Sequence, residues 1–267
     1  MAFYVLRALE EYELILAERR EQIKTILLEK KNATVAELAE YFEISTETIR
    51  RDFEALEKEG FLIKSYGGAT LMMRKSISYS QKMKSGIMTD TKKRIAVSAA
   101  KLIKPNDCIF LDHSTTVYEM CDEIAHLPLT VMTNSLVVMN RFSGCDNIKL
   151  TIPGGNFSPM YQAFFGLEAV GYLQRHCVDK AFFSCKTLDI GRGLNDSEEM
   201  VADMRKNIVE NSGFSCLMAD NTKFNKTAFV QTCKFSGIDC IATDQEPEDA
   251  WTNFLEEAHI KLLIGKE

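Results

Sequence analysis

From Lys92 onward the sequence alternates between short apolar runs and longer segments with helical periodicity. Chains with this alternation fold into mostly parallel sheets whose two faces are covered by helices. The sequence therefore predicts an α/β domain over residues 92–267. The expected strands are Cys108–Leu111, Leu129–Met132, Ile148–Ile152, Lys180–Phe183, Ser215–Ala219, Cys240–Ala242 and Lys261–Ile264. The expected helices are Lys92–Ile103, Val117–Ala125, Ala163–Gln174, Glu198–Asn211 and Glu248–Ala258.

Polar and glycine residues follow four of these strands directly, in the stretches Asp112–Thr116, Thr133–Ser135, Pro153–Gly155 and Asp220–Lys223. In a parallel sheet these stretches fall at the carboxyl edge, where such folds bind ligands. Taken singly, each stretch is explained by the ordinary use of Ser, Thr, Asp and Gly in caps and loops. Their convergence on one edge favours a small-ligand site.

The residues ahead of this domain have the pattern of a helix-turn-helix followed by a hairpin. Arg19–Leu28 has helical periodicity, and Thr34 with Glu37 fits the capping box that begins a second helix. A third helix is expected over Ser45–Lys58, with Ser45 as its N-cap. Phe61–Gly68 then has the pattern of a short β-hairpin, or wing. In such a unit the helix after the turn enters the major groove of DNA.

Hydroxyl and guanidinium groups lie off the apolar face of the third helix, where they suit phosphate oxygens and base edges. The predicted DNA-binding residues are Ser45, Thr46, Thr48, Arg50 and Arg51 on this helix, with Lys64 and Tyr66 on the wing. The alternative is a solvated helix start in which Arg50 and Arg51 pair with Asp52 and Glu54. Residues 1–75 hold 12 Lys+Arg and 14 Asp+Glu, so DNA binding requires the basic groups to gather on one face.

Length and composition fit a two-domain globular protein, with 267 residues, 46% hydrophobic residues and a net charge of −6. The Ser-, Met- and Lys-rich stretch Leu71–Thr91 has no clear period and is expected to be a linker. The predicted organisation is an extension over 1–18, a winged helix-turn-helix over 19–70, a linker over 71–91 and a sensor domain over 92–267.

The sequence predicts a cytoplasmic protein. Charged residues interrupt the apolar start of the chain, no small-residue cleavage site follows, and no apolar run is long enough to span a membrane. The eight cysteines are scattered without a Cys-x-x-Cys pair, which is typical of reduced, buried thiols. His113 and His176 have no partner at metal-ligand spacing, so neither a metal nor a cofactor is expected.

Both halves closely resemble the DeoR/GlpR family of bacterial transcription regulators. In the N-terminal half the matching residues are Val35–Ala39, Ile44–Asp52, Leu56, Gly60 and Gly67–Ala69. In the C-terminal half they are Lys92, Ile95–Ala96, Phe110–Asp112, Thr115–Thr116, Thr133–Ser135, Gly154–Gly155, Phe165–Gly166, Asp179, Ala181–Phe182, Asp220 and Lys223–Phe224. The chain departs from the family at Ser114, which replaces a usual Gly, and at Lys186-Thr187, where small residues are usual.

This resemblance implies a sensor domain similar in fold to ribose-5-phosphate isomerase, with a phosphorylated sugar or related metabolite as effector. It implies double-stranded operator DNA as partner, a homo-oligomer, and repression of a carbohydrate operon that the effector relieves. Ser114, Thr115 and Thr116 would hold the phosphate, with positive charge from Lys92 and Lys223. The effector-binding residues expected besides these are Asp112, Asn134 and Asp220 on the sugar hydroxyls, and Gly154 and Gly155 where the backbone approaches closely.

Two alternatives remain. The first is a sugar-phosphate isomerase with an appended DNA-binding module, which needs a carboxylate base over the substrate. The related isomerases are expected to carry an acidic Asp-Gly-x-Asp-Glu run, whereas the corresponding segment here, Ser184–Ile190, has a single carboxylate. The sequence therefore predicts no catalytic residue. The second alternative is a DNA-binding protein whose C-terminal domain serves only oligomerisation.

Overall fold

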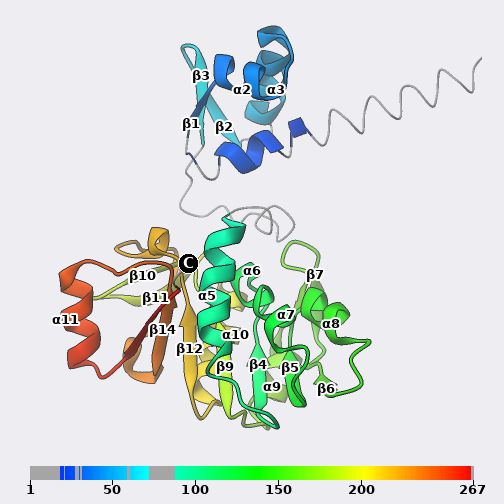
Figure 1. Cartoon of the computed structure of the whole chain (residues 1–267), viewed down its shortest axis with the longest axis vertical. Coiled ribbons are helices and arrows are strands. Elements are labelled where there is room, and N and C mark those ends of the chain that lie inside the picture. The colour runs from blue at the N-terminus through cyan, green and yellow to red at the C-terminus, as the bar shows by residue number, and fades with distance from the viewer. Residues whose placement is uncertain are drawn as a thin grey trace, which may run out of the picture. The chain divides into compact units, whose positions relative to one another are not determined.

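The computed structural model describes residues 19–20, 22–27, 30, 32–58, 61–71 and 88–265. They form two compact units, one within 19–71 and one within 89–265 (Figure 1). The expected extension over 1–18 lies outside the described residues, as does the expected linker apart from Leu71 and residues 88–91. Leu71 ends a strand, and the first helix of the larger unit begins at Thr89, so both lie inside folded elements.

The smaller unit has the predicted helices and wing. Residues 19–20 and 22–27 are helical. They are followed by β1 (Asn32–Thr34), α2 (Val35–Tyr41), α3 (Thr46–Lys58), β2 (Leu62–Ser65) and β3 (Gly68–Leu71). The hairpin β2–β3 is the expected wing, and β1, which the sequence did not predict, pairs with β3 on its other side. Gly68 is required there, because a Cβ at this position would lie 2.6 Å from the carbonyl oxygen of Ala33 in β1.

Local hydrogen bonds fix where the two helices begin. Thr34 accepts the Glu37 N–H through its Oγ1, and the Glu37 carboxylate accepts the Thr34 N–H, so the predicted capping box is confirmed. At the start of α3, Ser45 Oγ accepts the Thr48 N–H at 3.2 Å. The apolar faces of the helices then meet in a small core of fully buried side chains. Its largest members are Ile23, Leu27, Ile49, Phe53 and Leu56.

A buried carboxylate ties α3 to the helix that precedes β1. Asp52 is 1% exposed and accepts Arg19 Nε at 2.7 Å and Arg20 Nε at 2.9 Å. A buried carboxylate is tolerated only when it is paired and hydrogen-bonded, and here both oxygens have a guanidinium partner. These three residues therefore set how the first helix packs against α3.

The larger unit is built on a seven-stranded sheet in which every neighbouring pair is parallel. All seven predicted strands are present in it, which confirms the predicted fold class. In spatial order they are β15 (Lys261–Ile264), β14 (Cys240–Thr243), β12 (Ser215–Met218), β9 (Lys180–Phe183), β4 (Cys108–Leu111), β5 (Leu129–Thr133) and β6 (Ile148–Thr151).

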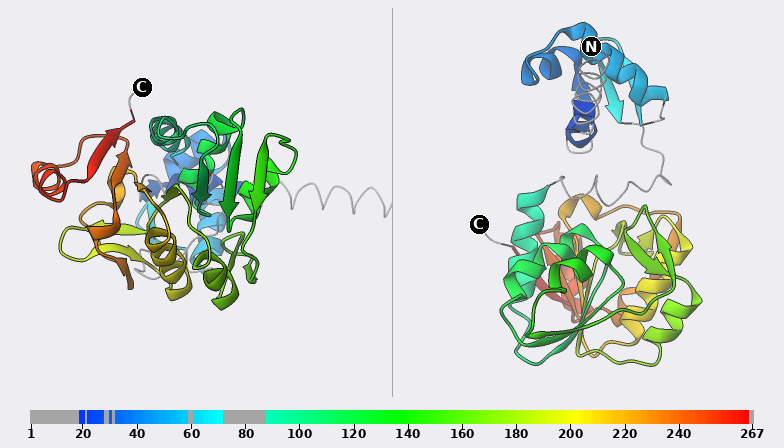
Figure 2. Two further views of the ribbon diagram at one scale, coloured as in Figure 1. Left: turned by 90° about the horizontal axis from the view of Figure 1, so that it is seen from below. Right: turned by 90° about the vertical axis from the view of Figure 1, so that its right-hand side faces the viewer.

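Helices cover both faces of this sheet (Figure 2). One face packs against α5 (Thr89–Ala100), α6 (Thr115–Tyr118), α7 (Met120–Ile124) and α8 (Leu136–Phe142). The other face packs against α9 (Leu167–Leu173), α10 (Glu199–Glu210) and α11 (Asp249–Glu257). Successive strand residues point to opposite faces, so Ile109 and Leu111 enter the first cluster while Phe110 enters the second. This is why the strands are apolar without alternation.

Several expectations about the connections were wrong. The helix expected from Ala163 begins only at Leu167, because Ala163–Phe165 forms β8, which pairs with β7 (Asn156–Ser158). The helix expected over Val117–Ala125 is divided into α6 and α7, and α8 was not expected. A second small sheet, also unexpected, contains β10 (Thr187–Asp189), β11 (Gly193–Asp196) and β13 (Val230–Cys233). Two short 3-10 turns, Asn221–Lys223 and Phe235–Gly237, complete the described elements.

All eight cysteines lie within residues 88–265 and are free thiols there. Four of them are buried and Cys177 is exposed. Across the part of the chain that the structure describes, no His, Cys, Asp and Glu side chains gather in a group able to hold a metal ion. In the same residues, no helix combines the length and apolar character needed to cross a bilayer.

We expect Asp52→Asn to lower the free energy of unfolding of the smaller unit by about 2 kcal/mol, because charge-assisted hydrogen bonds to both arginines are lost. Native-state hydrogen exchange of amides in α2 and α3 measures this. Glu47→Gln is the matched control, since it removes an exposed carboxylate from the same helix and should stay within about 0.5 kcal/mol of wild type. Equal protection in the two variants would contradict the role assigned to Asp52.

Candidate functional site

The third helix presents its basic groups to solvent. Arg50 and Arg51 are 61% and 76% exposed, and both lie near Glu47, at 3.7 and 3.8 Å. The alternative pairing with Asp52 does not form, because Arg19 and Arg20 take that carboxylate. Loose, exposed ion pairs of this kind contribute little to stability and exchange readily for another anion. The two guanidinium groups are therefore available for a phosphate or a base edge.

The remaining residues predicted to contact DNA are also accessible. Ser45 and Thr46 are exposed and Thr48 is half-buried at the N-terminal end of α3, where Ser45 Oγ and Thr48 Oγ1 lie 2.9 Å apart. On the wing, Tyr66 is fully exposed at the tip. Lys64 lies 3.3 Å from Glu57 and 3.6 Å from Glu54, so two carboxylates of α3 compete for its ammonium group.

The four stretches predicted to converge in the larger unit follow β12, β4, β5 and β6, and β9 lies between β12 and β4 in the same sheet. In spatial order β12 precedes Asp220 and Lys223, β9 precedes Ser184, β4 precedes Asp112, β5 precedes Asn134, and β6 precedes the glycine pair. Because these strands are parallel, all five connections leave the same edge. The strand order puts the Asp112–Thr116 loop in the middle of the row. The geometry therefore brings the predicted residues to one edge.

The loop after β4 is preorganised by its own hydrogen bonds. Asp112 Oδ1 accepts the Ser114 N–H at 2.8 Å, and Ser114 Oγ accepts the Val117 N–H at 3.3 Å as N-cap of α6. Thr115 and Thr116 are buried in the first turn. Ser114 is thus partly committed to internal contacts, which leaves the two threonines and their N–H groups as the main candidates for an anion.

Two lysines predicted near this loop are largely buried. Lys223 Nζ donates to Ser184 Oγ at 2.7 Å, and its Nζ lies 3.8 Å from Asp220 Oδ2. Ser184 Oγ in turn donates to the Met218 carbonyl at 2.6 Å. Lys92 in α5 is 6% exposed. Its positive charge interacts electrostatically with Glu119, the residue that directly follows α6. Cations held in low-dielectric surroundings interact strongly with a bound anion.

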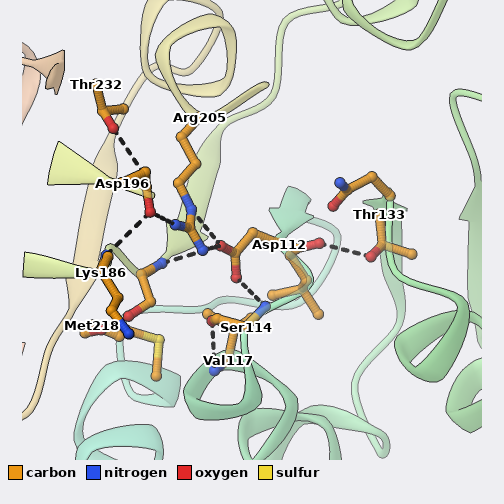
Figure 3. Close-up of polar contacts among 12 residues, drawn as sticks. Asp112, Ser114, Val117, Thr133, Lys186, Asp196, Arg205, Met218 and Thr232 are labelled. Atoms are coloured by element: carbon orange, nitrogen blue, oxygen red, sulfur yellow. Dashed lines mark hydrogen bonds and ion pairs between the residues drawn. The ribbon is translucent and has the colours of Figure 1, made fainter. Parts of the chain in front are cut away.

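A buried ionic cluster joins Asp112 of this loop to Arg205 and Asp196 (Figure 3). Arg205 of α10 donates to Asp112 Oδ2 through Nε at 3.1 Å and Nη2 at 2.9 Å, and to Asp196 Oδ1 through Nη1 at 2.5 Å. Asp196 also accepts Thr232 Oγ1 and the Lys186 N–H. Arg205 therefore links the loop after β4 to the small sheet β10–β11–β13.

The two carboxylates of this cluster titrate differently. Burial disfavours the charged form of each. At Asp112 the Arg205 guanidinium, helped by His113 and Ser114, outweighs burial and holds the pKa below its ordinary value. At Asp196 burial outweighs Arg205 and Thr232, and the charge of Asp112 adds to it, so the pKa is raised. As the pH falls, Asp196 therefore takes up a proton before Asp112 does.

The geometry changes the role expected for several predicted residues. Asp112 is fully buried with both oxygens engaged, so it positions the loop and is not free to bond a ligand hydroxyl. Asp220 accepts the Thr222 N–H and hydroxyl and likewise shapes its own turn. Gly155 is needed for packing, since a Cβ there would lie 2.5 Å from the Phe165 carbonyl oxygen, while Gly154 has φ +69°. Asn134 keeps its expected availability, because its buried Oδ1 has no partner among the described residues.

Sequence reasoning missed Arg205, Asp196 and Ser184. Arg205 follows Asp112 by 93 positions, and nothing local marks it as more than a polar residue of an amphipathic helix. Asp189, the single carboxylate noted after β9, accepts the Arg192 N–H at 2.9 Å in the β10–β11 turn. This hydrogen bond stabilises the turn between β10 and β11.

Comparison with protein-family models gives one match to each unit. Residues 19–75 match the DeoR-like helix-turn-helix domain, and residues 87–245, more than half of the chain, match the DeoR C terminal sensor domain. The chain belongs to the DeoR family. The predicted membership is thereby confirmed, and the chain is a DNA-binding transcription regulator by family.

Relatives within the DeoR family match along nearly their whole length. An uncharacterised HTH-type regulator of Bacillus subtilis, YulB, is 34% identical over 93% of this chain and 96% of its own. The L-fucose operon activator of Haemophilus influenzae is 31% identical, with 92% and 99% covered. The glycerol-3-phosphate regulon repressor of Escherichia coli is 25% identical, with 92% and 98% covered.

Among solved structures, ribose 5-phosphate isomerase A of Methanocaldococcus jannaschii overlaps 51% of this chain and 54% of its own at 17% identity. The TM-score is 0.38.

Arg205→Met should destabilise the DeoR-type sensor unit by about 3–5 kcal/mol, because it leaves two buried carboxylates without their counter-ion. Urea unfolding followed by the fluorescence of the buried Trp251 measures the change. Lys206→Met, the next residue of α10, is the control: its 3.9 Å pair with Glu210 is exposed, so little change is expected. A midpoint for Arg205→Met equal to that of Lys206→Met would show that the cluster does not support the fold.

Proposed function

We propose that this protein is a cytoplasmic, homo-oligomeric repressor of a carbohydrate catabolic operon, and that a phosphorylated sugar or related metabolite relieves the repression. The observation that carries the proposal is that Lys223, Thr115, Thr116 and Asn134 follow β12, β4 and β5 at one edge of the sheet, in a chain that also carries an exposed basic recognition helix. A sensor and a DNA reader in one chain are the two parts that such a switch requires.

The DNA partner is supported by the family membership and by α3. Arg50 and Arg51 can reach phosphates or guanine edges, while Ser45 and Thr46 add hydroxyl contacts at the end of the helix that enters the groove. Helix-turn-helix proteins commonly bind two half-sites as a symmetric dimer, which supports an oligomer.

The effector class is supported by the site and by two relatives. One of those relatives is named for an L-fucose operon and the other for glycerol-3-phosphate, a phosphorylated polyol. Within this chain, Lys223 and Lys92 supply positive charge near hydroxyls and N–H groups that suit a phosphate. Repression is favoured over activation because the relative named for a phosphorylated compound is a repressor. The relatives are named as regulators, and we propose no catalytic step for this chain.

Arg50→Ala and Arg51→Ala should each weaken operator binding. If the lost contact is to a phosphate, the slope of log affinity against log salt concentration should shrink by about 1. If it is to a base, discrimination should relax at one operator position, by about 1–3 kcal/mol. Fluorescence anisotropy with operator DNA at several salt concentrations distinguishes the two.

Lys58→Ala is the matched control for these variants, because it removes an equal charge from the exposed C-terminal end of the same helix. It should change affinity far less than either arginine variant. Wild-type binding by both arginine variants at every salt concentration would sink the assignment of α3 as the reading helix.

Lys223→Ala should leave operator binding intact without effector and abolish the influence of the effector. A ligand shifts DNA affinity only as far as it prefers one arrangement of the protein, and couplings of about 1–3 kcal/mol are usual. The measurement is an operator titration with and without a panel of sugar phosphates.

Lys226→Ala controls for charge in the same loop, since Lys226 is exposed and its ammonium group donates to the Thr222 carbonyl. It should respond to effector as wild type does. If Lys223→Ala and Thr115→Ala both respond like wild type, the effector binds elsewhere and the proposed site is wrong.

A further inference from the structure

Three side-chain oxygens at the β10–β11 hairpin are buried without a hydrogen-bond partner among the described residues. They are Thr187 Oγ1, Asn195 Oδ1 and Ser197 Oγ. Asn195 is 0% exposed, and Thr187 and Ser197 are each 9% exposed. Leaving a buried polar group unpaired costs free energy, and native proteins satisfy most such groups. Several of them in one hairpin point to a missing partner.

Two of these oxygens lie on the same face of the hairpin. Thr187 and Asn195 are directly opposed in the antiparallel register, so their side chains project to one side. Their neighbours Leu188 and Leu194 project to the other side, into the core cluster. Ser197 follows Asn195 by two positions, just beyond the end of β11. Both faces of the hairpin are buried, but the leucine face packs into the apolar core while the other face carries the unpaired oxygens.

The orientation of Asn195 defines the chemistry on this face. Its Nδ2 donates to the Gly193 carbonyl at 2.8 Å, which leaves Oδ1 as an acceptor only. The hydroxyls of Thr187 and Ser197 each donate and accept. A partner must therefore bring at least one donor to Asn195 while it can also accept from a neighbour. An alcohol hydroxyl does both, whereas a phosphate or carboxylate oxygen only accepts.

The hairpin begins next to the lysine of the effector site. Ser184 binds Lys223 Nζ, and Thr187 follows three residues later, a span of at most about 11 Å in an extended chain. The Lys186 N–H donates to the Asn195 carbonyl and to Asp196 Oδ1, each at 3.1 Å, which fixes the base of the hairpin. One molecule with a phosphate at Lys223 and hydroxyls at the hairpin fits that span.

We propose that Thr187, Asn195 and Ser197 form a specificity subsite that binds the hydroxyl groups of the effector and so selects among phosphorylated polyols and sugars. This rests on the proposed function, since it needs the phosphate to bind near Lys223. The phosphate supplies affinity common to all such ligands, and the subsite supplies the preference between them. A site built to bond a hydroxyl discriminates strongly against a ligand that lacks it.

The test compares Thr187→Val and Ser197→Ala with wild type in the full-length protein. Calorimetry gives the affinities for inorganic phosphate, glycerol 3-phosphate, and a set of pentose and hexose phosphates. Each variant should bind the preferred sugar phosphate about tenfold more weakly, about 1.4 kcal/mol, with its affinity for inorganic phosphate unchanged. Because the deleted hydroxyl has no partner, the melting temperature should not fall.

Thr232→Val is the matched control, because Thr232 Oγ1 donates to Asp196 Oδ2 at 2.8 Å. It should lower the melting temperature and keep the ligand preference. If Thr187→Val and Ser197→Ala retain the wild-type preference while Lys223→Ala loses all binding, the subsite is refuted and the proposed function stands. An equal loss for phosphate and sugar phosphate also refutes it. If no phosphate compound binds wild type, the proposed function fails and the subsite fails with it.

Discussion

The parallel direction of all seven strands in the large sheet is the constraint on which the rest of the sensor unit depends. Parallel neighbouring strands are joined by crossover connections, so every strand ends at the same edge of the sheet. The loop that follows each strand therefore begins at that edge. Asp112 and Lys223, which are far apart in sequence, both bond Ser184 in this way. The fold thus gathers polar groups from the loops that follow five strands.

The polar groups gathered at this edge include the buried carboxylate of Asp112, whose charge is compensated by Arg205. Asp112 accepts the Ser114 N–H, yet an uncompensated carboxylate next to the proposed anion site would repel the anion. Arg205 neutralises Asp112 from within the protein and takes Asp196 on its other side. The positive charges of Lys223 and Lys92 then remain for the proposed anion. Burial makes each of these pairings strong and also makes each partner indispensable.

Much of the fold was predictable because its signals are local. The runs at Cys108–Leu111 and Lys180–Phe183 are apolar on both faces, and the Thr34–Glu37 capping box is contained within four residues. The edge location of the site followed from the strands. The short segment Ala163–Phe165 was predicted as helix because Ala and Phe occur in helices as well as in strands. It forms a strand by pairing with β7, Asn156–Ser158, and its own residues do not indicate that pairing. The role of Asp112 depends on Arg205, and no spacing rule links residues so far apart.

The side chains on the two faces of the β10–β11 hairpin make different contacts. Leu188 and Leu194 anchor it in the core, and Asp196 anchors its end to Arg205, whereas Thr187 and Asn195 support neither contact through their side chains. Thr187 and Asn195 are buried, so a replacement that conserves their volume leaves the packed framework in place. With the proposed role of this face, duplicated genes of this architecture diverge in the metabolite they answer to by volume-conserving changes at very few codons, while the inherited scaffold persists.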